Sequence, residues 1–192
     1  MKYYAVKNGR EIGIYTDWES CRAQVEGFSG AEYKSFSKKS DAEDYLKGEQ
    51  KTVFGETVAY VDGSFNIKTG EYSFGAVIFS AEKAEEFSEK FSDRKMAEMR
   101  NVAGEIKGAE FVMRYCVEKG IKSVKIVYDY MGIEAWATGR WKTNKEGTSA
   151  YKAYYDSIKD RLSVEFLKVK GHSGDKYNDR ADALAKEALG IK

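Results

Sequence analysis

The order of strand-like and helix-like segments after residue 56 limits the folds that this chain can adopt. Three strand-like segments come first, and strands then alternate with helices. The predicted strands are residues 57–62, 72–80, 86–91, 123–128 and 164–169, and the predicted helices are residues 101–118, 131–137, 149–162 and 177–189. This order indicates an α/β domain with a mixed sheet.

The first 48 residues have a different pattern, which is that of a small ββαβα domain. Asn8-Gly9 predicts a type I′ hairpin turn between the first two strands, because both residues tolerate a positive φ. Capping boxes at residues 16–19 and 40–43 start the two helices. Residues 49–55 are then a short linker, and residues 56–192 form the second domain.

Composition narrows the classes of function. Hydrophobic residues make up 42% of the 192 residues, enough for a core, and the longest apolar run, Phe74–Phe79, is too short to cross a bilayer. The start of the chain has no sustained apolar stretch, and Cys21 and Cys116 match neither a disulfide framework nor a metal site. We therefore expect a cytoplasmic protein with no membrane partner and, by default, a monomer. The formal net charge of +1 gives no argument for nucleic acid, which has to come from local placement.

Three carboxylates lie at positions where a functional role is plausible: two at the ends of predicted strands and one beside the apolar stripe of a predicted helix. Asp62 ends the first strand of the second domain, although Asp-Gly at such a place is usually a turn. Glu105 borders the apolar stripe of the long helix, where a carboxylate is costly unless it is paired, hydrogen-bonded or metal-bound; alternatively it reaches solvent. Asp129 follows the fourth strand, at the carboxyl end where open α/β sheets bind ligands, or it caps the next helix.

Two further candidates lie near the end of the chain. Asp182 lies beside the core face of the last helix, and the competing Asp179 fits better as a residue of the first helical turn. His172, the one histidine, lies in a glycine-rich loop after the last strand, where it is either catalytic or simply solvated. Carboxylates that converge repel one another unless cations are present. Two divalent ions would relieve this repulsion and hold a phosphodiester for attack by water, and oxygen ligands favour Mg²⁺, or Mn²⁺ as a substitute, over zinc.

Several motifs of the second domain occur in a shared order. They are Val61-Asp62-Gly63-Ser64, Asn101 four residues before Glu105, Tyr128-Asp129, and Gly171-His172-Ser173-Gly174 leading to Asn178 and Ala181-Asp182-Ala183-Leu184-Ala185. In this order they resemble type 1 ribonuclease H over about residues 56–190. The resemblance implies a five-stranded mixed sheet flanked by helices, and hydrolysis of the RNA strand of an RNA–DNA hybrid that leaves 5′-phosphate and 3′-hydroxyl ends.

The resemblance also implies roles for single residues. Asp62, Glu105, Asp129 and Asp182 would be the catalytic metal ligands, and His172 would assist proton transfer or product release. Asn101 would help to read the substrate, Arg100 lies near the family's DNA-phosphate pocket, and Trp141 and Lys142 belong to the remaining substrate surface. The sequence departs from the family at Tyr130, where many members have Ser, and at Thr138-Gly139-Arg140, which replaces a basic protruding helix.

The first domain carries its own set of motifs. They are Tyr3-Tyr4-Ala5-Val6, Gly13, Trp18, Cys21-Arg22-Ala23-Gln24-Val25 and Tyr33-Lys34-Ser35-Phe36. They resemble the hybrid-binding domain, also known from caulimovirus viroplasmin, over residues 2–47. The resemblance implies that Tyr4, Trp18 and Tyr33 stack on the DNA backbone with help from Lys34; the alternative is that Tyr4 and Trp18 are core residues.

These observations favour a metal-dependent endoribonuclease that acts on RNA–DNA hybrids and holds them with its N-terminal domain. One alternative is a hybrid-binding protein with an idle nuclease site. Another is a nuclease or integrase of the same fold that acts on DNA.

Overall fold

The computed structural model describes residues 2–47, 57–80, 83–171 and 175–191. They form two compact units that divide near residue 51. The predicted linker, residues 49–55, lies outside the described residues. None of the described helices combines the length and the apolar character that a membrane crossing requires.

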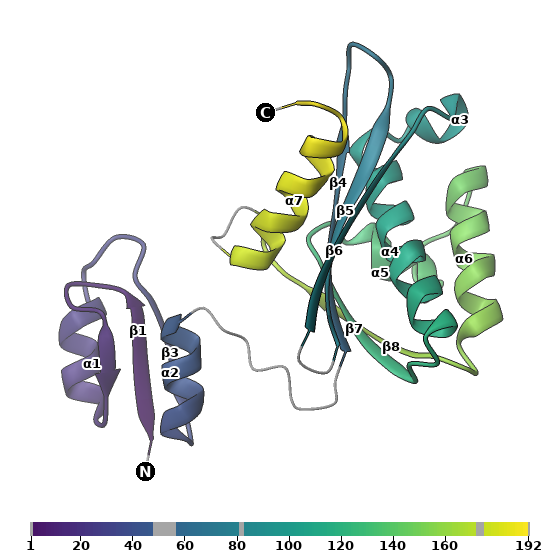
Figure 1. The fold of residues 1–192 in the computed structure, drawn as a ribbon. Helices are drawn as coiled ribbons and strands as arrows, with labels where there is room; N and C mark the ends of the chain where they lie inside the picture. Colours follow the sequence, from purple (N-terminus) through teal and green to yellow (C-terminus); the bar gives the residue numbers. More distant parts are fainter. Residues whose placement is uncertain (1, 48–56, 81–82, 172–174, 192) are drawn as a thin grey trace. The chain divides into compact units, whose positions relative to one another are not determined.

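The first unit is a three-stranded antiparallel sheet with one helix on each face (Figure 1). Its elements are β1 (Tyr3–Asn8), β2 (Gly13–Tyr15), α1 (Trp18–Val25), β3 (Glu32–Phe36) and α2 (Lys39–Lys47), and the strand order is β2-β1-β3. Because neighbouring residues of a strand point to opposite faces, Val6 packs on Cys21 of α1 whereas Ala5 lies on the side of α2. The predicted ββαβα order is confirmed.

The turn predicted at Asn8-Gly9 is wrong. β1 and β2 stop pairing at Val6, so a longer loop joins them, and neither Asn8 nor Gly9 has a positive φ. The end of α1 holds this loop instead: the Arg10 N–H donates to the Gln24 carbonyl at 2.9 Å, and the Arg10 guanidinium donates to two further carbonyls at 2.8 Å. The carbonyls of a last helical turn need such partners, and satisfying them outweighs a local turn preference.

The helix ends of the first unit follow the predictions in part. α1 begins after Asp17, whose carboxylate accepts a hydrogen bond from the Ser20 N–H at 2.8 Å, and it ends just before Gly27, which has a φ of +71°. α2 begins at Lys39, so the capping box predicted at residues 40–43 lies inside the helix rather than at its start.

The second unit contains a five-stranded mixed sheet in the order β6-β5-β4-β7-β8 (Figure 1). Its strands are β4 (Thr57–Phe65), β5 (Tyr72–Ser80), β6 (Lys83–Phe91), β7 (Ser123–Tyr128) and β8 (Ser163–Lys168), and its helices are α3 (Arg94–Ala97), α4 (Asn101–Glu118), α5 (Gly132–Ala137), α6 (Glu146–Ile158) and α7 (Lys176–Ala188). The first three strands pair antiparallel, whereas β7 pairs parallel with both β4 and β8. The predicted α/β fold with a mixed sheet is confirmed.

Helices cover both faces of this sheet and form two separate cores. α4, α5 and α6 lie on one face, and α7 lies on the other (Figure 1). Ile106 of α4 packs with Val61 of β4 in the first core, whereas Leu184 of α7 packs with Tyr60 of β4 in the second. Alternation along the central strand thus sends adjacent side chains into different cores, which explains why nearly all of β4 is buried.

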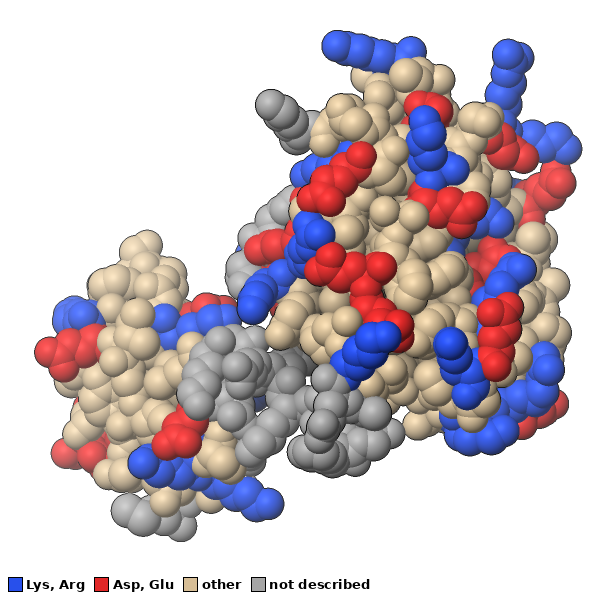
Figure 2. All heavy atoms as spheres, viewed as in Figure 1, with Lys and Arg blue, Asp and Glu red and all other residues tan. Residues whose placement is uncertain are grey.

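The surface of the second unit carries both signs of charge. Figure 2 shows acidic and basic side chains intermixed over the face in view. The edge strand β6 contributes Lys83, Glu85 and Lys90, and charges on an edge strand oppose pairing with another sheet. On the face in view, the charges are therefore mixed in sign rather than gathered into a patch of one sign.

Several elements of the second unit differ from the predictions; β6, for example, begins at Lys83 rather than at residue 86. β4 does not turn after Asp62 but continues to Phe65, with Asp62 opposite Gly75 of β5, because the antiparallel ladder extends through the Asp-Gly pair. The short helix α3 was not predicted, since four residues give no periodic pattern. α6 begins at Glu146, one turn before the predicted start.

Candidate active site

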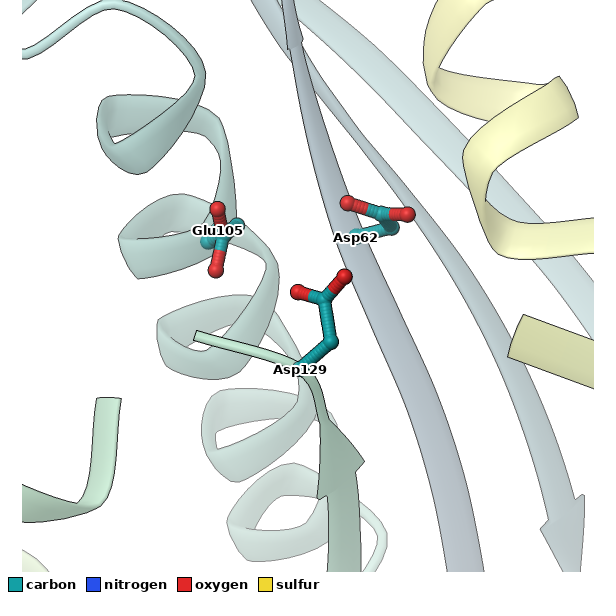
Figure 3. A group of neighbouring side chains, drawn as sticks. All are labelled: Asp62, Glu105 and Asp129. Carbon is teal, nitrogen blue, oxygen red and sulfur yellow. The ribbon is translucent and has the colours of Figure 1, made fainter. Parts of the chain in front are cut away.

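Three carboxylates from three separate elements meet at one edge of the sheet (Figure 3). Asp62 lies in β4, Glu105 in α4 and Asp129 directly after β7. One oxygen atom of each side chain lies within 4.8 Å of the chosen oxygen atoms of the other two. The structure therefore brings together three of the four predicted metal ligands.

Two glycines let α4 approach the sheet closely enough for this arrangement. A Cβ atom at Gly63 would overlap the backbone of Asn101 and Glu105, and one at Gly104 would overlap the backbone of β5. Since neither residue has a side chain, the backbone of Glu105 lies against β4, one residue from Asp62. The close approach of helix and strand is thus what sets the spacing of these two carboxylates.

Parallel strand pairing brings Asp129 to the same edge. β4 and β7 pair as far as Tyr60 and Val127, so Asp62 and Asp129 each follow the last pair by two residues. Asp129 does not cap the next helix, because α5 follows Met131 and no side-chain hydrogen bond caps it. The Asp129 carboxylate points towards Asp62 and Glu105 instead (Figure 3).

Burial and mutual repulsion oppose the ionisation of these groups. Glu105 is 3% exposed and Asp62 is 8% exposed, so the alternative of a solvent-reaching Glu105 is wrong. Desolvation, followed by the charges of Asp129 and Asp62, raises the pKa of Glu105 to about 9. Desolvation and the charge of Asp129 raise the pKa of Asp62 to about 7, although a hydrogen bond from the Gly63 N–H at 2.7 Å acts in the opposite direction.

The donor set fits hard divalent cations. All the converging ligand atoms are carboxylate oxygens, which Mg²⁺ and Mn²⁺ prefer. Glu105 Oε1 accepts a hydrogen bond from Asn101 Nδ2 at 3.3 Å, but Glu105 Oε2 is buried and has no hydrogen-bond partner among the described residues. A cation would satisfy this oxygen and offset the repulsion within the group.

Asp182, the fourth predicted ligand, is not one of the three carboxylates that converge within 4.8 Å of one another. Its Oδ2 forms an ion pair with Lys186 Nζ at 2.6 Å, one turn further along α7. Its charge also contributes to raising the pKa of Asp62. Its binding of metal stays a prediction.

His172 lies outside the described residues, and its role stays a prediction as well. The preceding residue, Gly171, lies next to Asp129: a Cβ atom at Gly171 would come within 2.5 Å of Asp129 Oδ2. The chain after β8 therefore runs beside the carboxylates as far as the structure describes it.

A groove of about 350 Å³ adjoins this site. It is lined by Met99, Val102, Tyr130, Trp136, Lys142, Asn144, Lys145 and Thr148. Tyr130 directly follows Asp129, and Val102 lies one helical turn before Glu105. Aromatic walls combined with lysines suit the sugar–phosphate backbone of a nucleic acid.

The nucleic-acid residues predicted in the second unit lie around this groove or at the start of α4. Lys142 lines the groove, and the ring of the exposed Trp141 lies 5.8 Å from that of Trp136. Arg100 and Asn101 are exposed. Arg100 has a φ of +54°, the one positive value at a non-glycine residue in the described ranges, and such strained conformations cluster at functional sites.

Aromatic side chains form a row on the α1 side of the first unit. The Trp18 ring lies 5.6 Å from the Tyr4 ring and 5.7 Å from the Tyr33 ring. Trp18 is 43% exposed and Tyr33 is 44% exposed, whereas Tyr4 packs partly against the core. Trp18 is therefore not a core residue, and the row offers two exposed rings for stacking.

Lys34 lies on the other face of that sheet. It pairs with Ala5 across the strands, on the side of α2, and its ammonium lies 5.9 Å from the centre of the Phe36 ring. Paired residues of antiparallel strands share a face, and Tyr33 shares its face with Val6 instead. Any help that Lys34 gives to stacking has to come around the edge of the sheet.

Known proteins match both units. The sequence profile of the ribonuclease H family matches residues 55–190, and that of the ribonuclease H1 N-terminal domain matches residues 2–46. The chain belongs to the ribonuclease H family. The ribonuclease H of Idiomarina loihiensis is 32% identical over 142 aligned residues, and the match covers 67% of this chain and 85% of that protein.

Solved structures of ribonuclease H share the fold of the second unit. RNase H1 from the archaeon Halobacterium salinarum is 22% identical with a TM-score of 0.59, and the match covers 71% of this chain and 98% of that one. LC11-RNase H1 in complex with an RNA/DNA hybrid is 20% identical with a TM-score of 0.57, and the match covers 70% of this chain and 96% of that one.

Sequence reasoning missed two features of this ribonuclease H. The groove residues Trp136 and Lys145 were not predicted, although aromatic residues at 130, 136 and 141 are a readable signal after a strand that ends at a ligand site. Lys186 was also missed, although a lysine four residues after Asp182 on a helix predicts an ion pair.

Proposed function

We propose that this ribonuclease H cleaves the RNA strand of RNA–DNA hybrids with two divalent cations, Mg²⁺ or alternatively Mn²⁺, and leaves 5′-phosphate and 3′-hydroxyl ends. The convergence of Asp62, Glu105 and Asp129 around the unpartnered Glu105 Oε2 carries this proposal. Cations bound there would activate water and stabilise charge on the phosphate that is attacked.

Each residue has a defined task in this scheme. Asp62, Glu105 and Asp129 would hold the cations, with Asp182 as a further ligand on the side of α7. Asn101 fixes Glu105 through its hydrogen bond to Oε1. Because the pKa values of Asp62 and Glu105 are raised, cations compete with protons for these two groups, and binding is expected to weaken as the pH falls.

Two observations support a hybrid as the substrate. A solved structural neighbour is described in complex with an RNA/DNA hybrid, and the N-terminal unit matches the ribonuclease H1 N-terminal domain. The exposed rings of Trp18 and Tyr33 can stack on nucleic acid without reading its sequence, so this unit would hold the hybrid for cleavage by the second unit.

The test is cleavage of an end-labelled RNA–DNA hybrid, with double-stranded RNA and double-stranded DNA in parallel, each with and without Mg²⁺. We expect cleavage of the RNA strand of the hybrid alone, and a loss of at least about 100-fold in Asp62→Asn. Asp160→Asn is the matched control, because Asp160 is exposed and precedes the amino end of β8, at the opposite end of the parallel strands.

Other outcomes would support the alternatives. Tight hybrid binding without cleavage in saturating Mg²⁺ or Mn²⁺ would indicate an idle nuclease site. Cleavage of double-stranded DNA at the rate of the hybrid would indicate a DNA nuclease of the same fold.

The task of the N-terminal unit has a separate test. We expect Trp18→Ala to weaken hybrid binding by about 5- to 150-fold, the range for losing one stacked ring, while the cleavage rate at saturating hybrid changes little. Trp18→Phe keeps a ring and should lie close to the wild type. Equal affinities of the wild type and Trp18→Ala would remove Trp18 from the binding surface.

A further inference from the structure

Lys186 is held beside the carboxylates by the tight packing of α7 on the sheet. The Ser73 hydroxyl of β5 donates a buried hydrogen bond to the Ala185 carbonyl at 2.6 Å. A Cβ atom at Gly75 would overlap the backbone of Ala181 and Ala185, so the missing side chain lets α7 lie directly on β5. The backbone of Lys186, which follows Ala185, is therefore held against the sheet.

The Lys186 ammonium pairs with the carboxylate next to the three-carboxylate group. Its Nζ lies 2.6 Å from Asp182 Oδ2, and the two residues are one helical turn apart. Gly75 pairs with Asp62 across the strands and contacts α7 at Ala181 and Ala185, so Asp182 and Lys186 each follow a residue that packs beside Asp62.

The other basic residue on this stretch of α7 is engaged elsewhere. Arg180 pairs with Glu86 of β6 at 2.8 Å and with Glu187 at 2.9 Å. Lys186 is thus the cation of α7 that is placed to neutralise Asp182.

We propose that Lys186 is a positioning residue that occupies Asp182 as a tethered cation and sets the concentration of divalent ion needed to fill the α7 side of the site. The inference rests on the proposed function, because it takes Asp182 as a metal ligand. An ammonium and a divalent cation on one carboxylate repel each other, so the Lys186 side chain has to leave Asp182 when a metal ion binds there. After it leaves, its stem keeps the ammonium near the site, where it can meet a substrate phosphate.

The test is calorimetric titration of the full chain with Mg²⁺, and in parallel with Mn²⁺, without substrate. In each titration, Lys186→Gln should bind the more weakly held of its two metal ions about tenfold more tightly than the wild type does, because the competing charge of Lys186 is gone. Lys186→Arg keeps the charge and should behave like the wild type. Lys159→Gln is the matched control for net charge, because Lys159 is exposed and pairs with Asp156 near the amino end of β8.

The possible outcomes separate this inference from the proposed function. If Asp62→Asn weakens ion binding while Lys186→Gln binds as the wild type does or more weakly, the role of Lys186 is overturned and the metal site stands. If the wild type binds no divalent ion, or Asp62→Asn binds as well as the wild type, both proposals fail. Lys186→Met, which retains an apolar stem, should repeat the result for Gln, and a difference between the two would point to packing rather than charge and overturn the proposal.

Discussion

Replacing Glu105 by Gln should stabilise the metal-free protein at neutral pH. The raised pKa of Glu105, about 9 against 4.5 for an ordinary glutamate, means that the folded state holds a proton which the unfolded state has lost. The free energy of unfolding therefore falls as the pH rises from 4.5 towards 9. At 1.36 kcal/mol per pH unit, this group costs about 3 kcal/mol at pH 7, and Gln removes that cost while it keeps the shape and can still accept from Asn101.

The measurement is thermal unfolding of the full chain by calorimetry, in chelator, at pH 5 and pH 7. For a unit of this size, about 3 kcal/mol corresponds to a rise in Tm of roughly 6 to 12 °C at pH 7. At pH 5 the difference between the variant and the wild type should shrink to below about 1 kcal/mol. Glu118→Gln, at an exposed position on the same helix, should stay within about 0.5 kcal/mol of the wild type at both pH values.

Two results would refute this reasoning. If the stability gap between Glu105→Gln and the wild type were the same at pH 5 and pH 7, protonation of Glu105 would not be its cause. If the variant were less stable than the wild type in chelator at pH 7, the carboxylate would be stabilised by partners that the structure does not contain.

Three more outcomes are expected. Gly63→Ala should destabilise the second unit by about 3 kcal/mol, because its Cβ would meet the backbone of Asn101 and Glu105; an unchanged midpoint in urea denaturation would contradict this. Ser73→Ala should cost about 1 to 3 kcal/mol in the same assay, since it removes a buried hydrogen bond to the α7 backbone, and a neutral result would show that packing alone holds the helix. Mg²⁺ at 100 times its dissociation constant should raise the free energy of unfolding of the wild type by about 2.7 kcal/mol at pH 7.5; the same increase in Asp62→Asn would place the bound ion elsewhere.

Local patterns sufficed to predict most elements and the positions of the carboxylates. The helix over residues 101–118 and the strands 72–80 and 123–128 occur with the predicted bounds, because periodic apolar residues mark them directly. The turns were less predictable. Asn8-Gly9 and Asp62-Gly63 are both typical of turns. Contacts with α1 impose another conformation on the first pair, and pairing with β5 does so on the second.

In the candidate site, too, local sequence patterns predicted some features and tertiary contacts decided the others. Asp62 and Asp129 were correctly predicted to lie together, because the parallel pairing of β4 and β7 ends two residues before each of them. The distance between Asp62 and Glu105 was not readable, because it depends on how closely α4 lies on the sheet at Gly63 and Gly104.

The linear order of residues was enough to name the candidate metal ligands, because ligand chemistry belongs to the side chains themselves. Only the packed structure decided how those side chains affect one another. Burial raises the pKa of Glu105, and Asp182 forms an ion pair with Lys186. Such effects depend on distances and dielectric surroundings in three dimensions, and these exist once helices and strands from distant parts of the chain have come together.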